Sequence, residues 1–321
     1  MRISLRLAFY VAAFPLVMVV SAAADDPDLV DPPRSIRIQA LDDPAKGVWV
    51  ELAGFIELGS PTMSRDGQWI AFDAYKEGFN RSRAECWIAR RDGRDLKRLT
   101  YGAVPRFSPD GKRILFFREK VNGYDGPDGV FVVNIDGAGE TRIGPGRWPD
   151  WSPDGKWIAM SVGGEETGGA RIGAMICVAK ADGSDVREIA QGDCPSWSPD
   201  GKKLAYCYRA PESPPRIMIR DAQGDAKATE VGIGFFRPNW TSDGESLVCN
   251  GVQDEELAMV RLYRNGPQAV FFQPNIYSDP MSPFASSNGR EVVFIARKAK
   301  PPAKQTPARP ASGRDGGRSR V

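Results

Sequence analysis

The chain has 321 residues, a formal net charge of +2 and no histidine. The lack of histidine excludes Ser-His-Asp and Cys-His nucleophile systems and histidine-ligated metal centres, and it removes the commonest acid–base residue near neutral pH. The sequence also contains no Walker loop, GxSxG elbow or EF-hand spacing. We therefore expect no cofactor, no metal and no catalytic residues, although a pair of carboxylates could still hydrolyse a glycoside.

Residues 1–24 have the three-part layout of a cleaved signal peptide. Two arginines precede an apolar run from Leu7 to Val20, and three alanines at 22–24 end the segment. The run is too short to span a bilayer comfortably, and no other long apolar segment follows. This layout predicts a periplasmic or secreted protein without a transmembrane span; a buried N-terminal helix or a retained anchor is the alternative.

A short pattern then occurs six times along the chain. Each copy holds a proline, a bulky residue two positions later in most copies, a tight turn and a second apolar run. The copies begin near Pro61, Pro105, Pro149, Pro195, Pro238 and Pro283, and their turn glycines are 44, 44, 46, 43 and 45 residues apart. A period of this length indicates a propeller or a solenoid.

Each copy reads as a β-hairpin. Proline is tolerated at strand starts, edges and bulges, so we expect it to mark the start of an inner strand. The turn residues, which we expect to be structural, are Asp66-Gly67, Asp110-Gly111, Asp154-Gly155, Asp200-Gly201, Asp243-Gly244 and Asn288-Gly289. The residues two positions after the prolines are expected to fill the gaps between sheets; they are Met63, Phe107, Trp151, Trp197, Trp240 and Ala285.

Third and fourth strands follow the hairpin in most copies. Third strands that end in a second turn are visible at 86–93, 130–137, 176–183 and 217–224, and fourth strands at 96–100 and 186–190. Four strands per repeat make a propeller blade. The sequence therefore predicts an all-β fold, a six-bladed β-propeller of four-stranded blades.

The last blade lacks two strands in its own repeat. The segment 297–321 is too rich in proline, glycine and charge to pack, whereas strand-like runs at 35–41 and 47–52 precede the first repeat. We expect these N-terminal strands to complete blade six, which gives a propeller over 35–296 without open sheet edges. Residues 297–321, with eight Lys or Arg against one Asp, form a predicted disordered basic tail that either contacts an anionic surface or is a solvated linker.

Among the five cysteines, one pair is predicted to be able to form a disulfide. Cys194 and Cys207 lie on either side of the first turn of blade four and could face each other. Cys86, Cys177 and Cys249 lie in apolar strands, and Cys177 and Cys249 are expected to be buried.

We expect a binding site at the mouth of the central channel. The candidate ligand- or partner-binding residues flank the inner-strand prolines and are Arg106, Arg147, Trp148, Asp150, Asp193 and Arg237. Aromatic and charged side chains of this kind could hold a peptide or a sugar, or they could simply plug the channel. Long variable loops are expected on the face opposite the Asp-Gly turns, at 73–85, 117–129, 161–173, 207–216 and 250–257, and functional residues are often found in such loops.

The repeated PxWSPDGKxIAY-type core, with a second Asp-Gly turn about 25 residues later, resembles the WD40-like (PD40) repeat of the TolB-type propellers over about residues 35–296. The resemblance implies a six-bladed propeller in the cell envelope, here without the additional N-terminal α/β domain of TolB. The repeat is also similar to the propellers of prolyl-oligopeptidase-type and tricorn-like peptidases and of oligogalacturonate lyases. Those enzymes use histidines, which this chain lacks.

Two functional hypotheses follow. The first is a non-enzymatic, monomeric propeller that binds a protein or peptide in the cell envelope, with no nucleic-acid partner. The alternative is a propeller that binds a carbohydrate or another small ligand, including a histidine-free glycan hydrolase or lyase. Two acids converging at about 5 to 9 Å on the variable-loop face would favour glycoside chemistry, whereas scattered single charges would favour binding.

Overall fold

A computed structural model of the chain describes residues 34–298, apart from 41–42, 44–45, 51, 56, 76–82, 120–127, 168–169, 224–226, 252–256, 264–265 and 272–276. The predicted signal peptide lies outside the described residues, as does the predicted tail from residue 299 onward. The regular elements of the described residues are all strands, apart from a single residue in a 3₁₀ turn. The predicted all-β class is therefore confirmed.

Within the described residues the strands form six four-stranded sheets and one small hairpin. Blade one is β3 (Glu57–Met63), β4 (Trp69–Tyr75), β5 (Glu85–Arg90) and β6 (Lys97–Tyr101). Blade two is β7 (Ala103–Phe107), β8 (Arg113–Arg118), β9 (Gly129–Asn134) and β10 (Thr141–Gly144). Blade three is β11 (Arg147–Trp151), β12 (Trp157–Val162), β15 (Met175–Lys180) and β16 (Arg187–Gln191).

The remaining blades repeat this arrangement. Blade four is β17 (Asp193–Trp197), β18 (Lys203–Tyr208), β19 (Arg216–Asp221) and β20 (Thr229–Ile233). Blade five is β21 (Phe235–Trp240), β22 (Ser246–Gly251), β23 (Leu257–Tyr263) and β24 (Gly266–Phe271). Blade six is β25 (Tyr277–Ala285), β26 (Glu291–Lys298), β1 (Ser35–Ala40) and β2 (Gly47–Val50). The hairpin β13 (Glu165–Thr167) and β14 (Ala170–Ile172) lies inside the variable loop of blade three.

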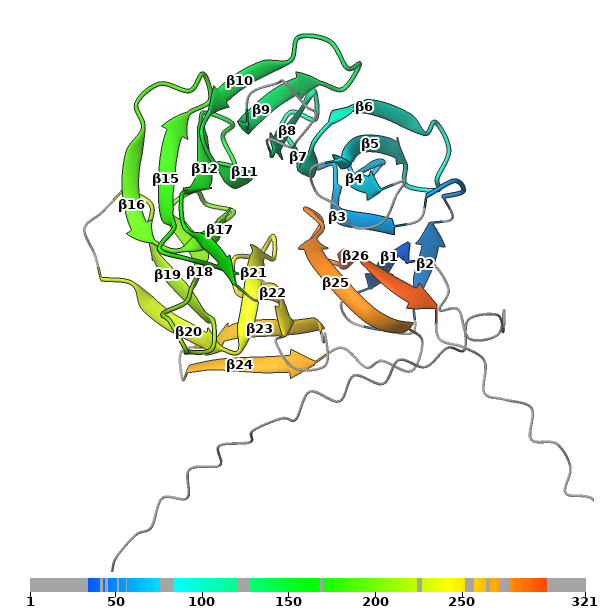
Figure 1. Cartoon of the computed structure of the whole chain (residues 1–321). Coiled ribbons are helices and arrows are strands. Elements are labelled where there is room, and N and C mark those ends of the chain that lie inside the picture. The colour runs from blue at the N-terminus through cyan, green and yellow to red at the C-terminus, as the bar shows by residue number, and fades with distance from the viewer. Residues whose placement is uncertain are drawn as a thin grey trace, which may run out of the picture. The chain divides into compact units, whose positions relative to one another are not determined.

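The first strand of each hairpin repeat is the innermost strand of its blade. These inner strands, β3, β7, β11, β17, β21 and β25, contact one another in this order, and β25 contacts β3 in turn. The blades therefore surround a central channel, around which Figure 1 shows them in sequence order. Every four-stranded sheet lies radially, so its middle strands are covered on both faces.

The N-terminal strands close the ring, as the sequence predicts. In blade six the strand order is β2-β1-β26-β25, and β1 pairs antiparallel with β26 so that Ile36 is opposite Ile295 and Ile38 is opposite Val293. Figure 1 shows the first and last strands of the chain in this one blade. Because β26 runs to Lys298, the first two residues of the predicted tail belong to a strand.

Ion pairs join blades six and one at both ends of their contact. The Arg91 guanidinium, in the second turn of blade one, donates to both carboxylate oxygens of Glu291 on β26, at 2.6 and 3.0 Å. At the other end Glu57 on β3 lies 3.3 Å from Arg34 and 3.6 Å from Arg297. The closing blade is thus attached by charge as well as by strand pairing.

The first turn of every blade has the same hydrogen bonds. The turn glycine has a φ between 68° and 71° in all six copies, a left-handed conformation that favours glycine. In blade three the Asp154 carboxylate accepts hydrogen bonds from the Ser152 hydroxyl (2.6 Å) and the Lys156 amide (3.0 Å). In the sixth copy Asn288 does the same with its side-chain oxygen, which accepts from Ser286 and from the Arg290 amide. The side-chain oxygens of these turn residues therefore accept hydrogen bonds from groups within the same turn.

The prolines do not begin the inner strands, which corrects the expectation from the sequence. Each lies inside its strand at a β-bulge, where the pairing with the second strand skips residues. The residue before each proline has a positive φ of 39° to 54° although none is glycine; these are Ser60, Val104, Trp148, Cys194, Arg237 and Ser282. Such a conformation costs about 1 to 2 kcal/mol per residue, so the surrounding packing must impose it.

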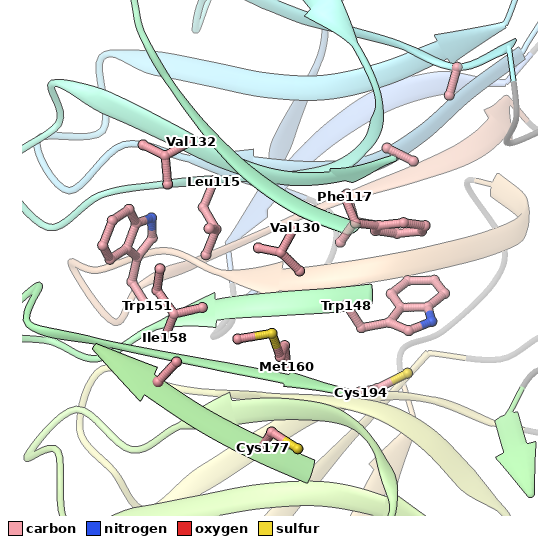
Figure 2. Close-up of a cluster of buried hydrophobic side chains, with 14 of the residues drawn as sticks. Leu115, Phe117, Val130, Val132, Trp148, Trp151, Ile158, Met160, Cys177 and Cys194 are labelled. Carbon is pink, nitrogen blue, oxygen red and sulfur yellow. The ribbon is translucent and has the colours of Figure 1, made fainter. Parts of the chain in front are cut away.

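The core consists of clusters between neighbouring blades. Figure 2 shows the largest one, in which Leu115, Val130 and Val132 of blade two face Ile158 and Met160 of blade three. The cluster lies between Trp148 and Trp151, which are at opposite ends of β11. A tryptophan between two sheets fills much of this gap, as expected from its column in the repeat.

The structure contradicts the predicted disulfide. All five cysteines are buried free thiols. The register of β17 and β18 places Cys207 opposite Asp193, whereas Cys194 lies one residue later, in the bulge, and belongs to the cluster between blades two and three. Burial raises the pKa of both thiols, to about 12 for Cys207, so neither is prone to ionise.

The ring closure can be tested by removing buried side-chain volume from β1. Ile38 is only 1% exposed, so we expect Ile38→Ala to lower the free energy of unfolding by about 2 to 4 kcal/mol. The matched control is Val48→Ala on β2, opposite Ile38 but 51% exposed, which should change it by less than about 0.5 kcal/mol. Urea unfolding followed by tryptophan fluorescence measures both. Equal, small effects would contradict the expectation that the buried face of β1 stabilises the ring.

The turn function of the aspartates is tested at Asp154. We expect Asp154→Ala to lower the free energy of unfolding by about 0.5 to 1.5 kcal/mol, and Asp154→Asn by less than about 0.5 kcal/mol, because Asn288 makes the same bonds in blade six. The Ser152 hydrogen bond is the main cause that lowers the pKa of Asp154. Its stabilisation is therefore present above the ordinary pKa and is lost as the pH falls below about 4. Unfolding curves at several pH values would contradict this if the alanine effect persisted in acid.

Candidate functional site

The channel is nearly closed at the level of the six bulges. The residues before the prolines, named above, all line a cavity of about 20 Å³ there. That volume is close to the space one water molecule needs. The Arg237 guanidinium lies 4.4 Å from the ring centre of Trp148 and donates to the Ser282 hydroxyl at 3.1 Å. Arg237 and Trp148 thus close the channel as a plug contributed by blades five and three.

A larger pocket lies next to the plug, toward the Asp-Gly turns. Its volume is about 340 Å³, within the range of small-ligand pockets. Pro109, Pro153 and Pro199, from the first turns of blades two to four, are at its rim together with Arg65 and Ser287. We call this cavity the turn-face pocket.

Aromatic side chains form the walls of the turn-face pocket. All six residues two positions after the prolines line it: Met63, Phe107, Trp151, Trp197, Trp240 and Ala285. The indole nitrogens of the three tryptophans are buried and make no hydrogen bond to any described residue. These tryptophans therefore contribute apolar surface to the pocket rather than hydrogen-bond donors.

The floor of the pocket consists of the residues directly after the prolines. Five of them line it: Arg106, Asp150, Ser196, Asn239 and Phe284. Three also join neighbouring blades: Asp150 accepts from the Trp197 amide (2.8 Å), Ser196 accepts from the Trp240 amide (3.4 Å), and Asn239 donates to the Pro283 carbonyl (2.9 Å). These bonds fix the floor to the ring.

Arg106 and Asp150 are the charged groups of the floor. Burial raises the pKa of the Asp150 carboxyl to about 6, although the Arg106 charge and the Trp197 and Trp151 amides act in the opposite direction. Burial also lowers the pKa of Arg106, while the charges of Asp150 and Asp73 oppose that shift. Both side chains keep some exposure to the pocket, so their charges can act on a ligand.

Arg147 and Asp193 line neither cavity, which corrects the sequence-based assignment. Arg147 donates to the Glu119 carboxylate at 2.7 Å, at the end of the blade where variable loops were expected. Asp193 is buried and accepts from the Arg171 amide (3.0 Å) and the Cys194 amide (2.9 Å), which attaches the β13–β14 hairpin to blade four. Both residues support loops rather than face the channel.

The predicted site residues are thus divided among three places. Trp148 and Arg237 line the small cavity at the plug, Asp150 lines the turn-face pocket, Arg106 lines both cavities, and the other two residues hold loops. The described residues that line the pocket belong to the inner strands and the uniform turns, whereas much of the variable loops falls outside the described residues. Ser196, Asn239 and Phe284 were not predicted, although they occupy the same repeat column as Arg106 and Asp150.

The described residues contain no group of three acidic or cysteine side chains that could hold a metal ion. In this part of the chain we also find no helix with the length and apolarity that a membrane crossing requires.

No protein-family model matches the sequence, and neither does any curated protein. Several solved structures match the fold. A protein of Agrobacterium tumefaciens that carries the name TolB matches over 83% of this chain and 99% of its own length, with 15% identity and a TM-score of 0.63. TolB of Acinetobacter baumannii matches over 83% of this chain and 64% of its own length, with 15% identity and a TM-score of 0.55.

Propellers with other names are also similar. A chain of a nidogen/laminin complex matches over 82% of this chain and 98% of its own length, with 9% identity and a TM-score of 0.56. An oligogalacturonate lyase in complex with manganese matches over 84% of both chains, with 15% identity and a TM-score of 0.50. Identities this low show a shared fold and nothing about function. The chain folds as a β-propeller similar to those of TolB proteins.

Proposed function

We propose that this protein is a non-enzymatic TolB-like propeller that binds a protein or peptide of the cell envelope through the turn-face pocket. One observation carries the proposal: among the described residues that line the pocket, Asp150 is the one carboxylate, and a cation is its neighbour. Glycoside hydrolysis needs two carboxylates in complementary roles. A single carboxylate beside Arg106 favours binding over that chemistry.

The surroundings of the pocket suit a protein partner. A concave anchor site with aromatic walls resembles the centre of a protein interface, where a few buried aromatic and arginine residues carry most of the affinity. The short turns of several blades border the cavity and can contact a partner around an inserted side chain or chain end. The rigid ring supports this interface because its floor is hydrogen-bonded across blades.

A carbohydrate or another small ligand is the second candidate. The observation that favours it is the series of aromatic walls, Phe107, Trp151, Trp197 and Trp240, around a floor with hydrogen-bonding side chains. Sugars can pack on aromatic faces while polar groups bond their hydroxyls. Binding of a glycan to the same pocket would support this second reading.

The proposed location is the periplasm or the extracellular space, which the signal-peptide layout of residues 1–24 supports. We propose a monomer, because the inner strands already close into a ring within one chain. The basic tail would add contact with anionic surfaces.

The test blocks the pocket without changing its floor. Ser287 is exposed and lines the rim, so Ser287→Trp should fill the cavity while the protein stays folded. Full-length mature protein is used to capture partners from a crosslinked envelope extract, and mass spectrometry reads the bound proteins and glycans. We expect wild-type protein to retain a defined protein that Ser287→Trp loses by about tenfold or more.

The matched control is Gln68→Trp, which adds the same side chain to an exposed position of another first turn that does not line the pocket. It should capture the partner as wild-type protein does. Equal capture by Ser287→Trp would refute the pocket as the contact surface. Recovery of a glycan alone would move the proposal to the second candidate.

A further inference from the structure

The floor of the turn-face pocket contains one cation. The residues directly after the six prolines are Thr62, Arg106, Asp150, Ser196, Asn239 and Phe284. Five of these six positions are neutral or acidic, and Arg106 is the exception. Blade two therefore places a single guanidinium in an otherwise mostly uncharged floor with aromatic walls.

The Arg106 guanidinium is held in place but keeps free hydrogen-bonding capacity. It lies 5.1 Å from the ring centre of Phe284, and its Nη1 atom donates to the Pro105 carbonyl at 3.3 Å. Within the described residues it makes no other hydrogen bond and no ion pair. A guanidinium has five N–H donors, so most of them are available to a ligand.

Asp150 is not a direct hydrogen-bond or ion-pair partner of Arg106. Its charge acts on Arg106 from the neighbouring blade, but the two side chains form no ion pair, and the Asp150 Oδ2 atom accepts the Trp197 amide. An enclosed cation without a direct partner is unfavourable in the free protein. An anion that enters the pocket and pairs with Arg106 would offset the free-energy cost of enclosing this charge.

We propose that the turn-face pocket binds a carboxylate carried on an apolar or aromatic body, with the Arg106 guanidinium as its direct partner. This inference rests on the pocket being the binding site of the function proposed above. A guanidinium and a carboxylate can form two parallel hydrogen bonds, and the walls of Phe107, Trp151, Trp197 and Trp240 accept the apolar part. A dianionic phosphate fits less well, because ionised Asp150 lies beside the one cation of the floor.

Binding is expected to depend on the protonation of Asp150. The charged or donor groups that face it are Arg106 on β7, the Trp197 amide on β17 and its neighbouring Trp151 amide on β11; Arg65 lines the same pocket from the first turn of blade one. The pKa of Asp150 is about 6. Below that pH its carboxyl is neutral and no longer repels the ligand, so carboxylate affinity rises as the pH falls.

The experiment titrates the full-length mature protein with 3-phenylpropionate and, as the uncharged control, 3-phenylpropanamide. Binding is followed by NMR through the side-chain resonances of the three wall tryptophans, which line this pocket. We expect the acid to shift them with an affinity about threefold or more higher near pH 5 than near pH 7.5, and the amide to bind more weakly at both.

Three variants separate the contributions of Arg106 and Asp150. Arg106→Gln should weaken the acid by about tenfold or more and leave the amide unchanged, and Arg106→Lys should fall between, because lysine keeps the charge and loses the paired donors. Asp150→Asn should bind the acid near pH 7.5 about as well as wild-type protein does near pH 5. Thermal unfolding checks that each variant is folded, and Asp150→Asn and Ser287→Trp still test the inference if Arg106→Gln is not.

Peptides identify the source of the carboxylate. N-acetyl-Gly-Phe with a free C-terminus represents a chain end, and N-acetyl-Phe-Glu-amide represents an acidic side chain; binding of either, with loss in Arg106→Gln, supports the inference. Equal binding of acid and amide, or no shift of the wall tryptophans with any of these probes, overturns it. The proposed function fails separately, when Ser287→Trp captures partners as wild-type protein does.

Discussion

The antiparallel pairing of β1 with β26 is the interaction on which the rest of the structure depends. It supplies the strands that the sixth repeat lacks, and it leaves no interior sheet edge at the junction between first and last blade. The channel exists only when all six inner strands surround it. The plug and the turn-face pocket are therefore both products of a contact between residues about 250 positions apart in the chain. Loop-closure entropy opposes such a contact, and the buried Ile36 and Ile38 offset it.

A second constraint divides the channel. The bulge at each proline gives the preceding residue a left-handed backbone conformation, and the two positions that flank the proline contribute mainly to two different layers. The residue before the proline contributes to the constriction. In five blades the residue after it contributes to the floor of the pocket, and two of these residues, Arg106 and Asn239, also line the constriction. The strain of six such bulges is tolerable because each strand is fixed by pairing on one side and by packing against the adjacent inner strand.

This division explains what the sequence could and could not predict. The turns, the blade spacing and the N-terminal closure were predictable because each repeat column has one local cause, such as a glycine with positive φ or an aspartate that accepts turn hydrogen bonds. The sequence could not assign the channel residues to separate cavities, because Trp148 and Asp150 flank the same proline and yet line two different cavities. Nothing in the residue types indicates a positive φ at Trp148, Val104 or Arg237, since glycine is the usual sign.

The wall positions of the repeat are similar in most blades, whereas the floor positions differ from blade to blade, and the two sets have different functions. The wall positions are nearly uniform, with bulky side chains in five of the six blades, because each must fill a similar gap between sheets. The floor positions differ in every blade, and three of them, Asp150, Ser196 and Asn239, are used to join blades three to six. Arg106 makes no hydrogen bond to another blade, and its contact with blade six is the Phe284 ring at 5.1 Å. Most of its N–H donors therefore take no part in joining the blades, and this unused capacity is the basis for proposing a carboxylate ligand at this position.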